Sequence, residues 1–301
     1  MPAAVAMAEG SKVSDALSAA VDGLAAAGVE DPRLDAELLL GRAMGCGRAA
    51  LVADPGLEVP APAARAFGEM VRRRLRREPV AYILGSKGFR NIELTVDRRV
   101  LIPRPETELL VELALERQPA RVLDVGTGSG AIALAVADEL PDCEVVATDT
   151  SPGALEVARA NAARLGLAER VRFVEGTLPE DEVFDLVLAN LPYVAETDWP
   201  RLQPEVTKWE PREALLAGRD GLDAYRTLFV PDPSSERGSP LFRIATQRTA
   251  TLDARLVSAV AVEVGEGQAM AVAELARGAG FGSIEVRRDL AGIERVVVAV
   301  R

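Results

Sequence analysis

Short apolar strands alternate with helices from about residue 106 onward, and the first strand meets its helix through a glycine-rich turn. The strand is RVLDV (121–125), the turn is GTGSG (126–130) and the helix is AIALAVADEL (131–140). Further β-rich runs lie at 144–149, 171–176, 184–190, 258–265, 283–292 and 294–300. This alternation predicts an α/β domain with a mostly parallel sheet, whose last two runs form an antiparallel hairpin.

The first part of the chain has a helical pattern instead. Apolar residues recur at helical spacing after Val13, and Gly28 follows where a C-terminal cap would stand. Asp31 and Pro32 form a helix start signal, and a third helix is predicted at 61–77. We therefore expect a small all-helical domain at the N-terminus.

Two alternating runs, FRNIELTV (89–96) and RRVLIP (98–103), predict a β-hairpin that turns at Asp97. The stretch 229–257 is rich in Pro, Ser, Thr and Arg, and its weak periodicity predicts an irregular surface insertion. The expected organisation is a helical domain at 1–85, a β-hairpin linker at 86–105, and an α/β domain at 106–301 that carries this insertion.

Charge and residue content limit the chemistry that is available. The chain has 35 basic and 46 acidic residues, a net charge of -11, which argues against generic binding to nucleic acid or anionic membranes. It has 0 histidines, which excludes histidine bases and histidine metal ligands, and its 2 cysteines cannot build a cysteine-only zinc site. We expect no metal, no signal peptide or membrane span, a cytoplasmic location and a monomer. The arginine run at 72–77 is either a solvated helix face or a contact for an acidic partner.

The glycine-rich turn predicts a ligand site. Glycines at 126, 128 and 130 permit a tight turn, and backbone N–H groups and a helix N-terminus there point toward a ligand. Asp149 ends the second strand, where an acidic side chain can accept both ribose hydroxyls. The turn satisfies a dinucleotide fingerprint, so a nicotinamide cofactor is one alternative. With Asp124 in front, it resembles the S-adenosylmethionine (SAM) turn of class I methyltransferases.

A second motif follows a hydrophobic strand, FDLVLA, as Asn190-Leu191-Pro192-Tyr193. It resembles the Asn-Pro-Pro-Tyr motif of SAM enzymes that methylate a planar amide or aromatic amine nitrogen. The Asn190 side-chain oxygen and the Leu191 carbonyl can accept the two hydrogens of such a nitrogen, align it with the methyl group and stabilise its developing positive charge. Tyr193 offers an aromatic face to a planar group. The alternative is an ordinary turn at a strand end, built with Asn and Pro.

Several further segments occur in a fixed order: EPVAYILGSKGF (78–89), LIPRPETELLVELAL (101–115), WEPREALLAGRDGLDAYR (209–226), EVGEGQ (263–268) and DLAGIERVVVA (289–299). With the two motifs above, the chain resembles the glutamine-N5 methyltransferases of peptide chain release factors, the PrmC/HemK family, over most of its length. The resemblance implies a helical domain that helps to dock class 1 release factors, and a catalytic class I SAM-dependent methyltransferase domain with a Rossmann-like fold. The substrate would be the glutamine of their Gly-Gly-Gln loop.

The resemblance also implies roles for individual residues. The SAM site would comprise Gly126, Thr127, Gly128, Ser129, Gly130, Asp149, Leu178, which lies near adenine, and Asn190. The catalytic and substrate-binding clamp would comprise Asn190, Leu191, Pro192 and Tyr193. Arg104 and Glu106 would lie on the substrate side, although an ordinary helix start also explains them.

Two departures from the family pattern leave alternatives open. Leu191 stands where the family usually has proline, so the backbone carbonyl is kept but the fixed φ angle is lost. Asn-Leu-Pro-Tyr also occurs in ribosomal RNA adenine-N6 dimethyltransferases, so an adenine methyltransferase acting on RNA or DNA is the chemical rival. The sequence of 229–257 shows neither the helix nor the Pro-Gly-Gly turn that the family normally has there. Together with Leu191, this departure leaves a further alternative, a homologue that binds SAM or release factor but is catalytically impaired.

Overall fold

The computed structural model describes residues 11–179, 182–229 and 257–301. The chain divides into two compact units. One comprises Met1–Ser86 with Gln203–Trp209, and the other comprises Lys87–Leu202 with Glu210–Arg301. The predicted irregular insertion at 229–257 falls outside the described residues, apart from Phe229 and Val257.

The first unit is helical, as predicted. Its helices are α1 (Val13–Ala26), α2 (Pro32–Met44), α3 (Arg48–Ala53), α4 (Ala61–Leu75), α5 (Val80–Leu84) and α9 (Pro204–Trp209). Pro32 occupies the first turn of α2, and Gly28 has a φ of 75° just after α1, as the start and stop signals predicted. The short helices α3 and α5 were not predicted, and α4 ends at Leu75 rather than at residue 77. Leu24, Leu39 and Phe67 are among the residues that fill the core of this unit.

Most arginines of the run at 72–77 form ion pairs with acidic residues of this unit. Arg74, only 6% exposed, pairs with Asp35 and Glu205 at 2.6 Å each. Arg77 also pairs with Glu205 at 2.6 Å, and Arg73 pairs with Glu78 at the same distance. A run of like charges in the sequence therefore becomes a set of buried and half-buried ion pairs, which anchor the α9 segment to the helices of this unit.

The hairpin of the linker exists, but its second strand was predicted wrongly. The strands are β1 (Ser86–Phe89) and β2 (Ile92–Thr95), so the chain reverses at Arg90, which has a φ of 49°. Residues 98–103 form no strand. Asp97 instead starts a tight turn in which its Oδ1 accepts the N–H of Arg99 and its carbonyl accepts the N–H of Val100. Such side-chain-to-backbone bonds compete with a strand.

The second unit is built on a seven-stranded sheet in the described residues, with the order β5-β4-β3-β6-β7-β9-β8. The strands are β3 (Arg121–Val125), β4 (Glu144–Asp149), β5 (Val171–Glu175), β6 (Phe184–Ala189), β7 (Val257–Glu263), β8 (Ser283–Arg288) and β9 (Glu294–Val300). Strands β3 to β7 are parallel, whereas β9 is antiparallel to β7 and β8. The predicted α/β class and the C-terminal hairpin are confirmed.

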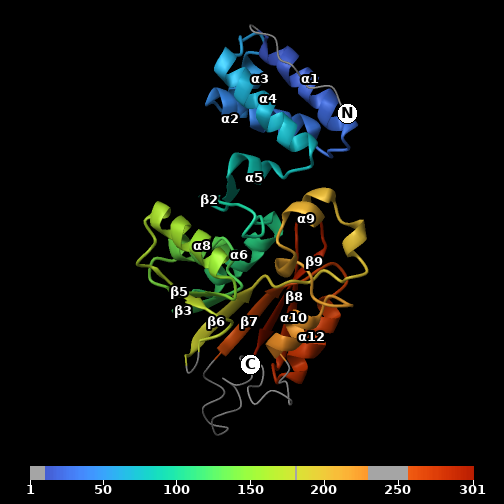
Figure 1. Ribbon diagram of the computed structural model, residues 1–301. Helices are drawn as coiled ribbons and strands as arrows, with labels where there is room; N and C mark the ends of the chain where they lie inside the picture. The colour runs from blue at the N-terminus through green and yellow to red at the C-terminus, as the bar shows by residue number, and fades with distance from the viewer. Residues whose placement is uncertain (1–10, 180–181, 230–256) are drawn as a thin grey trace. The chain divides into compact units, whose positions relative to one another are not determined.

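Helices connect and cover these strands. They are α6 (Glu108–Arg117), α7 (Ala131–Glu139), α8 (Pro152–Leu165), α10 (Asp223–Phe229) and α12 (Ala269–Gly278), with short 3-10 turns η1 (Pro105–Thr107), η2 (Trp199–Arg201) and η3 (Arg212–Ala214). In Figure 1, α10 and α12 lie together in orange and red, and α12 packs on β8 and β9. Within the part of the chain that the structure describes, no helix is long and apolar enough to cross a membrane.

The strand order defines where a ligand can bind. The sheet grows from β3 through β4 to β5 on one side, and then returns to β6 on the other side of β3. Val125 and Ala189, the last residues of β3 and β6, are paired in register. Loops that leave neighbouring strands in opposite directions open a crevice at their carboxyl ends. The glycine-rich turn and the Asn-Leu-Pro-Tyr motif begin at these two points.

Candidate functional site

A cavity of about 310 Å³ lies at the carboxyl edge of the sheet in the second unit. It brings together residues from the turn after β3, the ends of β4 and β5, and the loop after β6. The predicted site residues that line it are Gly126, Gly128, Asp149, Leu178, Asn190, Leu191 and Pro192. Both sequence motifs therefore face one space, although about 60 residues separate them along the chain.

The glycine-rich turn uses its backbone N–H groups differently from the prediction. The N–H groups of Gly126 and Thr127 both donate to the carbonyl of Thr148 at 2.9 Å, and that of Gly130 donates to Thr127 at 2.8 Å. These groups hold the turn against the end of β4 rather than point toward a ligand. Gly126 has a φ of 75°, which favours glycine, and it lies beside Leu191, since a Cβ there would be in ordinary contact with Leu191 Cδ2 at 3.6 Å.

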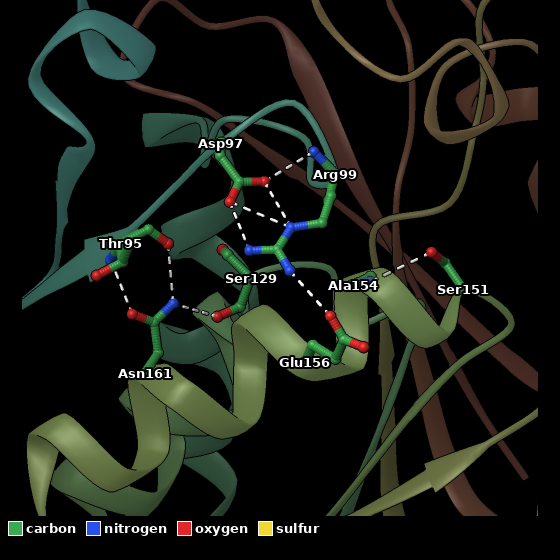
Figure 2. A network of polar contacts seen from close by, with 8 residues as sticks. All are labelled: Thr95, Asp97, Arg99, Ser129, Ser151, Ala154, Glu156 and Asn161. Carbon is green, nitrogen blue, oxygen red and sulfur yellow. Dashed lines mark hydrogen bonds and ion pairs between the residues drawn. The ribbon is translucent and has the colours of Figure 1, made fainter.

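The Asp149 carboxylate is fixed at the cavity wall. Its Oδ2 accepts the N–H of Gly128 at 2.9 Å, and its Oδ1 accepts the N–H of Ser151 at 2.8 Å. Each oxygen keeps a second lone pair that can accept a hydroxyl of a ligand. Ser151 in turn caps α8 by accepting the N–H of Ala154 (Figure 2). These two hydrogen bonds fix the orientation of the acid that is predicted to hold a ribose.

Asp124, just before the turn, is fully buried at 0% exposed. Its Oδ2 accepts the hydroxyl of Thr127 at 2.6 Å and the N–H of Ala133 at 3.2 Å. Burial raises the pKa of this carboxyl to about 7, against the lowering effect of these two donors. Its Oδ1 has no hydrogen-bond partner among the described residues.

The buried side-chain amide of Asn161, which the sequence analysis did not single out, is hydrogen-bonded to the glycine-rich turn. Figure 2 shows Asn161 of α8 reaching both the linker and the turn. Its Nδ2 donates to the carbonyls of Thr95 and Ser129, at 3.0 and 2.9 Å, and its Oδ1 accepts the N–H of Thr95 at 2.7 Å. Figure 2 also shows Arg99, which lines the cavity, between Asp97 and Glu156. These bonds tie the linker to α8 and to the glycine-rich turn.

Replacement of Asn161 should show this support directly. Asn161→Ala leaves the buried Ser129 carbonyl and two part-buried backbone groups of Thr95 without their partner, so we expect the free energy of unfolding to fall by about 2–4 kcal/mol. Urea unfolding measures this loss. The matched control is Asn91→Ala, in an exposed hairpin turn, which should change stability by less than about 0.5 kcal/mol. Equal stability of the two variants would remove Asn161 from the scaffold of the site.

Asn190 is held by two side chains in series, Thr107 and Glu263. Its Nδ2 donates to Thr107 Oγ1 at 2.9 Å, and the Thr107 hydroxyl donates to Glu263 Oε2 at 2.6 Å. Glu263, at the end of β7, is 1% exposed, and burial raises the pKa of its carboxyl to about 7. Thr107 comes from the η1 turn, so three separate segments meet here. The carbonyl oxygen of the Asn190 amide is left outside this chain of bonds.

Tyr193, at the other end of the motif, is turned toward the same acid. Its hydroxyl donates to Glu263 Oε1 at 3.4 Å, and burial near that carboxylate raises the pKa of the phenol well above its usual value. Gln268 Nε2 donates to the Tyr193 carbonyl at 2.9 Å. One carboxylate therefore contacts the side chain at one end of the motif and reaches the other end through Thr107.

The remaining predicted residues do not line the cavity. These are Thr127, Ser129, Gly130, Tyr193, Arg104 and Glu106. The guanidinium of Arg104 pairs with Glu210 Oε1 at 2.5 Å, and Glu210 Oε2 accepts the N–H of Ile102. Arg104 is therefore held by an acid in the segment after α9.

Sequence reasoning missed the supporting residues Arg99, Thr107, Asn161, Glu263 and Gln268. Two of the segments that carry the family resemblance contain three of these residues. Thr107 lies within LIPRPETE, and Glu263 and Gln268 lie within EVGEGQ. Neither segment predicted which partner its polar residues would meet. Among the described residues, no three acidic or cysteine side chains are grouped so that they could hold a metal ion.

Family models match both units of the chain. Residues 15–85 match the PrmC N-terminal domain, and residues 122–209 match a methyltransferase domain. Among curated proteins, the release factor glutamine methyltransferase of Cereibacter sphaeroides is 40% identical over 290 residues, covering 96% of this chain and 98% of that protein. The protein of the same name from Geobacter sulfurreducens is 42% identical over 280 residues, covering 91% of each chain. That from Caulobacter vibrioides is 40% identical over 293 residues, covering 95% of each.

A solved structure shares the fold at low sequence identity. The hMettl16 catalytic domain, solved in complex with the MAT2A 3'UTR hairpin 1, superposes with a TM-score of 0.52. It is 14% identical, and the match covers 81% of this chain and 83% of that one. At this identity the likeness concerns the fold alone.

Proposed function

This chain belongs to the release factor glutamine methyltransferases, and from that premise we propose that it transfers a methyl group from SAM to the side-chain nitrogen of a release factor glutamine. The predicted class I methyltransferase fold and enzyme class are confirmed by the matching methyltransferase domain and the sheet order. The single observation that carries the site assignment is that Asn190 shares one cavity with the glycine-rich turn and Asp149. An adenine methyltransferase is not favoured, because the similar full-length relatives are named for glutamine.

The cavity fits SAM by the character of its lining. Asp149 would accept the ribose hydroxyls through its free lone pairs, and Leu178 supplies an apolar wall for the adenine. Asp124 is fully buried and does not line the cavity, so it supports the turn through Thr127 and Ala133 rather than by contact with SAM. When bound, SAM would supply an electrophilic methyl group on a sulfonium and leave as S-adenosylhomocysteine, and the methylated nitrogen would lose one hydrogen to water as a proton. The protein has only to position the nucleophile.

An amide nitrogen is a weak nucleophile because its lone pair is delocalised into the carbonyl. Asn190 Oδ1 and the Leu191 carbonyl would accept its two hydrogens, hold the nitrogen in line with the methyl group and stabilise the positive charge that develops there. Neither group has to act as a strong base, which agrees with a chain of 0 histidines. The roles of Pro192, Tyr193, Arg104 and Glu106 in substrate binding belong to the same proposal.

The proposed acceptor is N5 of the glutamine in the Gly-Gly-Gln loop of class 1 release factors. We expect a release factor incubated with tritiated SAM and this enzyme to take up label at that glutamine, identified by mass spectrometry of its peptide. The control is the same release factor with that glutamine replaced by alanine, which should take up none. Uptake of label by ribosomal RNA instead of release factor would support the adenine alternative.

A catalytically impaired homologue is the remaining alternative, because Leu191 replaces the usual proline. A single-turnover assay at saturating enzyme distinguishes it, since an impaired homologue would bind SAM and release factor without transferring label. The cytoplasmic location, the monomeric state and the lack of nucleic acid and membrane binding stay predictions.

A further inference from the structure

Thr107 stands where a threonine ordinarily caps a helix, but it does not do so here. It is the residue before α6, and its side chain makes no capping hydrogen bond to that helix. The hydroxyl is directed instead between Glu263 Oε2 at 2.6 Å and Asn190 Nδ2 at 2.9 Å. Thr107 is 3% exposed, so water cannot easily replace either partner. The hydroxyl therefore serves the site rather than the helix.

When Glu263 is ionised, only one assignment of donors and acceptors satisfies both hydrogen bonds of the Thr107 hydroxyl. A carboxylate only accepts, so the single hydroxyl proton of Thr107 must go to Glu263. Toward Asn190 the hydroxyl can then only accept, so the group that faces it must be the NH2 end of the amide. The carbonyl end of Asn190 is consequently presented on the opposite side.

We propose that Thr107 and Glu263 are positioning residues that set the direction of the Asn190 amide, so that Oδ1 rather than Nδ2 meets the hydrogens of the substrate nitrogen. The proposal rests on the proposed function, because direction matters only if Asn190 accepts a hydrogen bond from a substrate amide. A reversed Asn190 would present an NH2 group to the NH2 group of the glutamine. Two donors facing each other cannot hold the nitrogen in line.

Protonation of Glu263 would allow the Asn190 amide to adopt the reversed direction. A protonated carboxyl can donate to Thr107, whose hydroxyl proton is then free to turn toward Asn190 and accommodate a reversed amide. The groups that face Glu263 are Thr107 and Glu106 from the η1 turn, Tyr193 from the loop after β6, Tyr225 from α10 through the backbone carbonyl, and Arg295 from β9. Burial dominates among their effects and raises the pKa of Glu263 to about 7. Because the ionised form is the competent one, the methyl-transfer rate should fall as pH falls through about 7.

The test compares Thr107→Val, which keeps the shape but removes the hydroxyl, with Thr107→Ser, which keeps the hydroxyl. We expect kcat of the valine variant to fall on the order of 10- to 100-fold. The KM for the release factor and the dissociation constant of SAM should change less than about threefold. The serine variant should retain kcat within about threefold. The acidic limb of the kcat–pH profile should persist in the serine variant and vanish in the valine variant. A purely structural role for Thr107 would change none of these pH profiles.

A second measurement does not depend on activity. Asn91, Asn161 and Asn190 are the three asparagines of the chain, so labelling with [15N]asparagine gives a small, assignable set of side-chain amide signals. We expect the Asn190 amide signals to titrate with a midpoint near 7 in the wild type and to stay flat in Thr107→Val. Asn91 and Asn161 serve as internal controls. Unchanged kcat and an unchanged titration in the valine variant would overturn the proposal. Failure of the wild type to label release factor would instead refute the proposed function. The titration would still show whether Thr107 and Glu263 set the direction of the Asn190 amide.

Discussion

Asn190→Ala should reduce the methyl-transfer rate on the order of 10²- to 10³-fold, the loss expected when one preorganised hydrogen-bonding group is removed from a transition state. The alanine variant loses the Oδ1 acceptor that would hold the glutamine nitrogen. It keeps the turn and Asp149, because their hydrogen bonds do not involve the Asn190 side chain, and the cavity loses only the part of its wall that Asn190 supplies. We therefore expect the SAM dissociation constant to change less than about tenfold. Stopped incubations with tritiated SAM measure the rate, and calorimetric titration measures the affinity.

Asn91→Ala is the matched control, because it makes the same chemical change in an exposed turn away from the cavity. Its rate should equal that of the wild type. A rate near wild type for Asn190→Ala would remove Asn190 from the mechanism. A parallel loss of SAM affinity and rate would reassign this residue to cofactor binding alone.

Asp149→Ala should weaken SAM binding on the order of 100-fold, about 2.7 kcal/mol. The carboxylate would accept two ribose hydroxyls, and hydrogen bonds to a charged acceptor are the stronger kind. The variant also frees the N–H groups of Gly128 and Ser151, which the carboxylate holds at 2.9 and 2.8 Å. The turn would therefore lose part of its order in the free protein. Calorimetric titration with SAM gives the dissociation constant, and titration with NAD tests the nicotinamide alternative.

Asp142→Ala is the control for this change. Asp142 is exposed and lies just before β4, whereas Asp149 ends the same strand. Its replacement should leave the dissociation constant unchanged. Full SAM affinity in Asp149→Ala would show that the ribose is held by other groups. A turnover rate at saturating SAM close to wild type would confirm that Asp149 acts in binding.

Local patterns were enough to predict most of the elements. The alternation of strands and helices, the helix at 131–140, and the final antiparallel hairpin follow from side-chain periodicity and turn residues, which act over a few residues. The same reasoning placed the second strand of the linker hairpin wrongly. RRVLIP carries a strand pattern, but the Asp97 side chain bonds to the N–H of Arg99 and makes a turn there. Competing local hydrogen bonds of this kind are not visible in periodicity.

The two motifs of the site could be found in the sequence because each sits at a strand end with characteristic residues. Their meeting followed from a general rule on parallel sheets, and the cavity lined by both motifs confirms it. The helical segment at 203–209 belongs to the first unit, and nothing local predicts that. Glu205 pairs there with Arg74 and Arg77, which lie more than a hundred residues earlier.

The sequence by itself therefore determined the fold class, the two motifs and the chemistry that a chain without histidine can perform. Only the tertiary structure decided how the motif residues are oriented. Asn190 is directed by Thr107 and Glu263, which come from segments 83 residues before it and 73 residues after it. A hydrogen bond depends on the positions of two atoms in space, and the spacing of residues along the chain does not specify those positions. The direction of the Asn190 amide, for which we propose a catalytic role, thus follows from packing between distant segments.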